Sequence, residues 1–326
     1  MIRVPPTLVR RLLVAPLVLL AEAAFLLASP LLALLAILLA PVAGGSRPLR
    51  ALAIAVDFAA RHAACTLACF GLWVTRRRGH DAHYDLMRWF VGGVYRSIVR
   101  IARVDVRITD SDAVEQALST GTRPAVVLAR HAGEGDSLLV LHALLCRHRR
   151  RPRLVLHEAL RLDPLIDVLG RRLPNRFVDP RGGDTEVEIA AMSRGLDPDG
   201  AVLIFPEGGN FTPERRRRGI ERLEEAGHEE EATWARKMEH VSAPRPGGAL
   251  AAIEAAPGAD VVFVGHAGVP VGLADLWRQL PERQTIELKL WLARADEIPA
   301  GRDERIDWLF GWWRTLDEWV AERLQA

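Results

Sequence analysis

The sequence predicts an α/β domain, with a mixed central sheet flanked by helices, behind an N-terminal helical membrane module. Two observations lead to this prediction. From about residue 79 onward, short apolar runs alternate with amphipathic stretches, which is the pattern of a layered α/β domain. Before that point the chain is far more apolar than elsewhere. We therefore expect a membrane-associated module over residues 1–78 and the α/β domain over residues 79–326.

The first apolar run covers residues 12–43 and contains one charged residue, Glu22. As a straight helix it would measure about 48 Å at ~1.5 Å per residue, which exceeds a hydrocarbon core of ~30 Å. Pro30 lies near its middle, and arginines on both sides favour a cytoplasmic position for both ends. We expect a kinked hairpin that enters and leaves one leaflet. A single tilted span is the alternative.

A second apolar segment, residues 52–74, carries Asp57, Arg61 and His62 within about a turn and a half of helix. Polar residues gathered in this way favour an amphipathic helix at the membrane interface over a second span. The segment ends near Trp73 and is followed by three arginines, which suits a headgroup boundary. The alternative is a helix that packs against the α/β domain.

The rest of the chain reads as alternating elements. Residues 79–85 are polar and predict a linker, and residues 86–102 predict an amphipathic helix. Strands are expected at 104–109, 125–129, 154–156, 176–178, 201–205, 261–264 and 286–293. Helices are expected at 137–147, 164–172, 186–194, 213–239, 248–255 and 304–324. Tryptophans on one face of the last helix favour core packing, with contact to the bilayer or an acyl chain as the alternative: Trp308, Trp312 and Trp319.

Two polar motifs lie at the ends of two expected strands. His131 and Asp136, with four residues between them, follow strand 125–129, and a Phe-Pro-Glu-Gly motif closes strand 201–205. Open α/β sheets bind ligands at the carboxyl ends of their strands. His131 can act as a general base on a hydroxyl if Asp136 fixes its tautomer. The alternatives are a helix N-cap role for Asp136 and a plain loop position for His131.

The H-x4-D motif, the FPEG motif and the apolar N-terminus together resemble the glycerolipid acyltransferase family, the 1-acylglycerol-3-phosphate acyltransferases and their relatives. The resemblance runs from about residue 104 to the C-terminus. It implies that His131 and Asp136 catalyse acyl transfer from a thioester to a lipid hydroxyl. It also implies that the FPEG residues bind the acceptor: Phe205, Pro206, Glu207 and Gly208. A lipid hydrolase with the same His and Asp, and a non-catalytic lipid-binding protein, are the alternative functions.

The chain departs from this family directly after FPEG. Gly209 and Asn210 stand where many relatives have Thr and an Arg that meets the acceptor phosphate. Two further segments, residues 177–181 and 240–248, also resemble family motifs. The candidates for the missing positive charge are Arg130, Arg181 and Arg245. Ordinary solvated arginines are the alternative reading of all three.

Composition limits the partners. The net charge is +2, so there is no overall basic excess that would indicate nucleic acid binding. The expected partners are membrane lipids and a thioester co-substrate, acyl-CoA or acyl carrier protein, with no other cofactor and no metal. The expected location is the cytoplasmic face of a membrane. The charged stretch 214–239 predicts a solvated helix, although its four consecutive arginines could face headgroups or coenzyme A phosphates.

Overall fold

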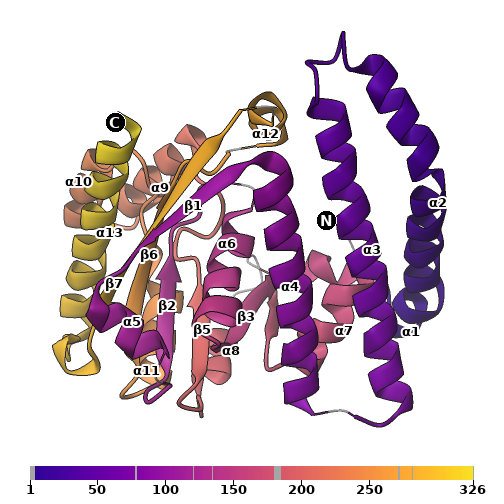
Figure 1. Cartoon of the computed structure of the whole chain (residues 1–326). Helices are drawn as coiled ribbons and strands as arrows, with labels where there is room; N and C mark the ends of the chain where they lie inside the picture. The colour runs from indigo at the N-terminus through magenta and orange to yellow at the C-terminus, as the bar shows by residue number, and fades with distance from the viewer. Residues whose placement is uncertain are drawn as a thin grey trace. The chain divides into compact units, whose positions relative to one another are not determined.

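Figure 1 shows the computed structural model, which describes residues 4–77, 79–119, 121–133, 135–179, 185–270, 272–280 and 282–325. Within these residues seven strands form one sheet in the order β1-β7-β6-β2-β5-β3-β4. The strands are β1 (Val104–Thr109), β2 (Ala125–Ala129), β3 (Arg151–His157), β4 (Arg176–Val178), β5 (Gly200–Ile204), β6 (Asp260–Ala267) and β7 (Gln284–Ala293). β2 runs parallel to β5 and β6, whereas β6 and β7 are antiparallel. The expected mixed α/β sheet is confirmed, and all seven expected strands form.

The helices flank this sheet and fill the N-terminal region. They are α1 (Thr7–Val9), α2 (Ala15–Leu39), α3 (Arg47–Val74), α4 (His80–Ala102), α5 (Asp112–Ser119), α6 (Asp136–His142), α7 (Pro164–Arg172), α8 (Thr185–Ser193), α9 (Pro213–Glu225), α10 (Glu229–Lys237), α11 (Pro246–Ala255), α12 (Leu273–Gln279) and α13 (Arg302–Gln325). Short π- and 3₁₀-helical segments add η1 (Arg10–Val14), η2 (Ala143–Arg147), η3 (Glu158–Leu162) and η4 (Ala295–Glu297).

The chain divides into two compact units. One comprises Met1–Asp105, Val155–Asp179 and Ala274–Gln284, and the other comprises Val106–Leu154, Pro180–Leu273 and Thr285–Ala326. In the second unit every residue of β2, β5 and β6 is buried. Parallel strands covered on both faces need apolar residues at nearly every position, so these strands appear in the sequence as continuous apolar runs. These continuous apolar runs are the reason why the three strands could be predicted from the sequence.

The expected hairpin within residues 12–43 is wrong. Thr7 to Leu39 form one uninterrupted helical run, and the chain turns only before α3. Pro30 lies inside α2, where it cannot donate a backbone hydrogen bond to the Leu26 carbonyl. The Ser29 hydroxyl donates to that carbonyl instead, at 2.7 Å. This replacement allows the helix to continue through the proline.

Two helical runs, Thr7–Leu39 and Arg47–Val74, are long and apolar enough to cross a membrane. On the first run the large apolar side chains are mostly exposed, among them Leu17, Leu20, Leu27, Leu31, Leu34 and Leu38. Side chains of this kind are stable in lipid but unfavourable in water. The helices therefore indicate association with a membrane.

Glu22, the single charged residue of the apolar stretch 12–43, is paired inside the first unit. Glu22 of α2 contacts His62 Nδ1 at 2.6 Å, and His62 Nε2 contacts Asp163, which caps α7, at 3.1 Å. Near the start of the run, the buried Arg10 binds the buried Asp167 at 2.9 Å. These polar contacts join α2 to α3, and both η1 and α3 to α7. Buried charges need such partners, because an unpaired buried charge would be strongly unfavourable.

Two local predictions need correction. Residues 79–85 are not a linker, because α4 begins at His80, and His83 Nδ1 lies 2.8 Å from the Gly79 carbonyl in its first turn. The expected helix over 213–239 is two helices, α9 and α10, separated at Gly227, which has a φ of 78°. Such a left-handed conformation favours glycine and ends a helix. α5 and α12 were not predicted at all.

The tryptophans of α13 pack in the core, as favoured by their spacing. The ring of Trp312 stacks on Phe263 of β6 with centroids 4.7 Å apart, and Trp319 meets Trp291 of β7 edge to face. Trp313, between them in the chain, is fully buried. α13 therefore contributes its aromatic face to the sheet.

Candidate active site

The two motifs found in the sequence meet at the carboxyl ends of β2 and β5. His131 Nδ1 lies 2.9 Å from Asp136 Oδ2, with the His131 side chain 21% exposed and Asp136 1% exposed. No described residue bonds to His131 Nε2. The imidazole is thus held from one side by a carboxylate, while its other nitrogen is open to a reacting group.

Asp136 is the first residue of α6, and it is not the N-cap, which is Gly135. Its Oδ2 turns back into the loop and accepts the backbone N–H groups of Ala132, at 2.8 Å, and Gly133, at 3.2 Å. Gly135 makes this reversal possible with a φ of 98°, a region that favours glycine.

The charge of Asp136 is stabilised despite its burial. Burial alone would raise the pKa of this carboxyl, but the hydrogen bond from His131 and the nearby His266 ring outweigh it and hold the pKa far below its ordinary value. Asp136 is therefore ionised throughout the physiological pH range. An ionised partner at Nδ1 favours the tautomer of His131 in which Nδ1 carries the proton and Nε2 is free to accept one.

Glu207 joins the two motifs through the backbone. Its Oε1 accepts the N–H of His131 at 2.9 Å, and its Oε2 accepts the N–H of Ser242 at 2.9 Å. Burial raises the pKa of Glu207 to about 7, although both hydrogen bonds and Arg130 act against this rise. The carboxyl group thus fixes the position of the histidine loop. The expected role of Glu207 in binding the acceptor stays a prediction.

The other FPEG residues contact either the His131 ring or Arg245. The ring of Phe205 lies 4.5 Å from the His131 ring, centroid to centroid. The carbonyl of the buried Pro206 accepts the N–H of Arg245 at 2.9 Å. Gly208 has a φ of 72°, and a Cβ there would lie 3.0 Å from the Arg245 guanidinium carbon. Glycine therefore allows Arg245 to lie directly against this turn.

The predicted arginines have different positions. Arg245 is half-buried beside Gly208, as just described. Arg130 is buried, and its guanidinium donates to the carbonyls of His266 and His240, both at 2.7 Å. It therefore connects the loop after β2 to the end of β6 and to the loop at His240. Arg181 lies outside the described residues. A role in substrate binding for any of these arginines stays a prediction.

Two arginines of α9 that the sequence analysis did not assign to the site join Arg245. The Arg215 guanidinium lies against Gly209, and burial, with repulsion from Arg222 and Arg215, lowers the pKa of Arg245. None of the three forms an ion pair within the described part of the chain. Most of their neighbours on α9 do, since Arg217 pairs with Glu214 at 2.9 Å. The guanidinium groups of Arg215 and Arg245 lie beside the FPEG turn, and the charge of Arg222 is close enough to act on Arg245. Together they form a positive cluster that can attract an anion.

Two further polar residues shape the site and were not predicted. Asp317 of α13 accepts the backbone N–H groups of residues 239–241, at 2.6 to 3.1 Å, and so holds the loop that reaches Arg130. His266 of β6 is fully buried behind Asp136. Nothing in the local sequence around either residue distinguished it, because its partners are distant in the chain.

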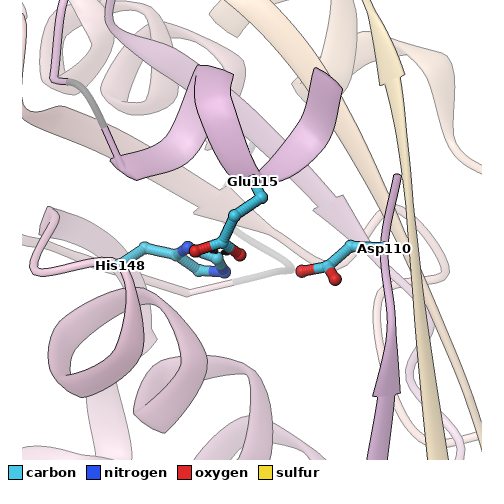
Figure 2. A group of neighbouring side chains, drawn as sticks. All are labelled: Asp110, Glu115 and His148. Atoms are coloured by element: carbon cyan, nitrogen blue, oxygen red, sulfur yellow. Dashed lines mark ion pairs between the residues drawn. The ribbon is translucent and has the colours of Figure 1, made fainter. Parts of the chain in front are cut away.

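One group of side chains could hold a metal ion. Figure 2 shows Asp110, Glu115 and His148, whose ligand atoms lie within 4.8 Å of one another. Arg147 already bridges the two carboxylates, at 3.2 Å from each. These ion pairs explain why the acidic residues lie together, and the group lies at the end of β1 rather than at the FPEG turn. The expectation that no metal takes part stays a prediction.

Comparison with known proteins agrees with this geometry. Residues 105–266 match the family model described as Acyltransferase, and the matched region contains β2, β5, both motifs and His266. No curated protein matches the chain. The match and the arrangement of the two motifs lead to the same conclusion, that the chain belongs to the acyltransferase family, which includes glycerolipid acyltransferases such as the 1-acylglycerol-3-phosphate acyltransferases.

Proposed function

We propose that this protein transfers an acyl group from a thioester, acyl-CoA or acyl carrier protein, to the hydroxyl of a lysophospholipid or related glycerolipid. The observation that carries this proposal is the 2.9 Å contact between His131 Nδ1 and Asp136 Oδ2, with Nε2 left open. This is the geometry of a general base with an orienting acid.

In the proposed reaction, His131 Nε2 takes the proton of the acceptor hydroxyl as its oxygen attacks the thioester carbonyl carbon. The carbon–sulfur bond then breaks, and the imidazolium returns the proton to the departing thiolate. Asp136 stays ionised and stabilises the imidazolium through Nδ1–H. The products are the ester and the free thiol, so His131 is regenerated in each cycle.

The neighbouring serine is poorly placed as a nucleophile. Ser137 Oγ donates to Asp136 Oδ1 at 3.2 Å, whereas a catalytic serine would donate to the histidine. Direct attack by the acceptor therefore fits the site better than an acyl-serine intermediate. Hydrolysis would need only water in the acceptor's place, so it remains a distinct outcome of the test below.

The charge around the FPEG turn supports an acceptor that carries phosphate. Arg245 and Arg215 supply positive charge at Gly208 and Gly209, and Arg222 adds positive charge that acts on Arg245. Guanidinium groups bind phosphate with paired hydrogen bonds, and these three have no competing acidic partner among the described residues. We infer that they replace the arginine that many relatives carry at the position of Asn210.

The N-terminal helices support a lipid substrate. The exposed leucines of α2 would lie in the bilayer, and Arg76 and Arg77 follow the end of α3, as at a headgroup boundary on the cytoplasmic side. A membrane-bound enzyme can take its acceptor directly from the lipid phase, which explains why an acyltransferase would carry this module.

The proposal is tested with purified full-length protein in vesicles, labelled acyl-CoA and a panel of lysolipid acceptors, followed by mass spectrometry of the lipids. We expect an acylated lipid that forms only when an acceptor is present. Release of free fatty acid at the same rate with and without acceptor would identify a hydrolase. No thioester turnover with any acceptor, from acyl-CoA or acyl carrier protein, would support a non-catalytic lipid-binding protein.

A further inference from the structure

His266 is a buried imidazole next to the dyad that the proposed reaction does not use. It lies near the end of β6, which pairs in parallel with β2 up to Ala129 and Val264. Its side chain is fully buried, with Nε2 3.1 Å from the carbonyl oxygen of Arg130 and 3.6 Å from Asp136 Oδ2. A polar side chain that is fully shielded from solvent calls for a structural or functional explanation.

The surroundings of His266 fix its tautomer. The two polar atoms nearest to Nε2, the Arg130 carbonyl and the Asp136 carboxylate, are both acceptors, so Nε2 must carry the proton. Nδ1 has no hydrogen-bond partner among the described residues. Burial, with a contribution from Arg130, lowers the pKa of His266 and keeps the ring neutral. The ring therefore has one N–H, and it points toward the dyad.

Arg130 and His266 form two reciprocal hydrogen bonds, in which the side chain of each residue donates to the backbone carbonyl of the other. The His266 ring donates to the Arg130 carbonyl, and the Arg130 guanidinium donates to the His266 carbonyl at 2.7 Å. The Arg130 backbone N–H also donates to Val264 at 2.9 Å. Because Arg130 directly precedes His131, these contacts fix the backbone from which the catalytic histidine extends.

We propose that His266 is a positioning residue, whose Nε2–H holds the Arg130 carbonyl and faces the Asp136 carboxylate, so that Asp136 keeps His131 in its catalytic orientation. The importance of this role for turnover rests on the proposed function. The 3.6 Å separation from Asp136 is longer than a hydrogen bond, so this contact acts through the N–H dipole. Removal of one such neutral donor should slow the reaction about tenfold.

The test compares four single variants of the full-length protein in vesicles. His266→Leu removes the donor, His266→Gln places an amide N–H near the position of Nε2, and His266→Asn carries the same amide on a shorter side chain. His148→Leu is the matched control, because His148 is also buried in the second unit but contacts neither Asp136 nor Arg130. Thermal unfolding is measured for each variant.

We expect kcat to fall about tenfold in His266→Leu and His266→Asn with both KM values unchanged, and to be largely restored in His266→Gln. His148→Leu should keep the wild-type kcat. If His266→Leu does not fold, the test rests on the kcat values of the other two variants, and His266→Gln should be faster than His266→Asn. Equal kcat in the Gln and Asn variants would overturn the proposal.

A double-mutant cycle then separates positioning from packing. In an Asp136→Asn background, His266→Leu should lower kcat by a smaller factor, because the part of its action that passes through Asp136 is already lost and only the contact with the Arg130 carbonyl remains. The same fold-loss in both backgrounds would show a role independent of Asp136 and would overturn the proposal.

One readout does not depend on acyl transfer. Histidine NMR of the wild type should show the proton of neutral His131 on Nδ1, and His266→Leu should increase the Nε2–H form. If the wild type transfers no acyl group, the proposed function fails, while this tautomer shift still supports the positioning role. An unchanged tautomer ratio in His266→Leu would overturn the positioning role whether or not the enzyme is active.

Discussion

Glu207 Oε1 accepts the backbone N–H of His131 at 2.9 Å, across 76 positions of the chain. This bond connects the two motifs that the sequence analysis recognised separately. The carboxyl group of the FPEG motif supports the backbone of the histidine loop, and its second oxygen supports the backbone at Ser242. The position of His131, the proposed base, thus depends on a residue that need not touch the substrate.

The first prediction concerns this support. In Glu207→Gln the amide NH₂ cannot accept a hydrogen bond, so one of the two backbone N–H groups, at His131 or Ser242, loses its buried partner. We expect a loss of about 1–3 kcal/mol in the free energy of unfolding, together with slower acyl transfer. Urea denaturation measures the first and a transfer assay the second. Glu221→Gln on the exposed face of α9 is the control and should change neither by much. Unchanged stability in Glu207→Gln would contradict the assigned role.

The second prediction concerns acid stability. The pKa of Asp136 in the folded protein lies below its ordinary value of 3.8, because hydrogen bonding outweighs burial. Ionised Asp136 therefore stabilises the fold above about pH 4, and this contribution is lost as the pH falls through and below that value. Urea midpoints measured between about pH 6 and pH 3 should decline more steeply in the wild type than in Asp136→Asn, which cannot ionise. Parallel curves for the two proteins would contradict the shift.

The third prediction concerns the acceptor. Arg245→Ala and Arg215→Ala should each raise the KM for lysophosphatidic acid about tenfold to a hundredfold, because each removes a charge-assisted contact to phosphate. The KM for a neutral monoacylglycerol should change much less. Arg217→Ala is the matched control, since Arg217 lies on the same helix but is 62% exposed and paired with Glu214. Equal effects on charged and neutral acceptors would exclude a phosphate site at this cluster.

The fourth prediction concerns topology. Arg10, near the start of the helical run, pairs with Asp167 of α7, and Arg50, just after the run, donates to the Leu280 carbonyl in the same unit. Because both ends of the run are held against this unit, tags placed before residue 7 and within residues 40–46 should report the same side of the membrane. Accessibility of the tags to an impermeant reagent, before and after permeabilisation, measures this. Tags on opposite sides would show that the helix crosses the bilayer and would contradict these contacts.

The strands and the dyad could be predicted because their signals are local. A buried strand such as β2 is a continuous apolar run, and Asp136 reaches His131 across a single loop. The match to the acyltransferase family and the seven-stranded sheet confirm the family and the fold inferred from these signals.

The supports of the dyad could not be predicted, because they depend on the packing of distant segments. His266 bonds to the carbonyl of Arg130, which lies 136 positions earlier in the chain. Asp317 accepts backbone N–H groups of residues 239–241, which lie 76 to 78 positions before it. The helix through Pro30 was missed for a different reason. A proline normally interrupts a helix, and the sequence alone did not reveal that the Ser29 hydroxyl would satisfy the Leu26 carbonyl.

The most direct test of the central claim is the rate of acyl transfer in His131→Ala, measured in vesicles at saturating donor and acceptor, with thermal unfolding to confirm that the protein is folded. A missing general base should lower kcat by about 10²–10⁴-fold, with the unfolding temperature close to that of the wild type, because His131 is partly exposed and its ring lies outside the core. A folded His131→Ala protein that transfers acyl groups at a near-normal rate would contradict the assignment of His131 as the catalytic base.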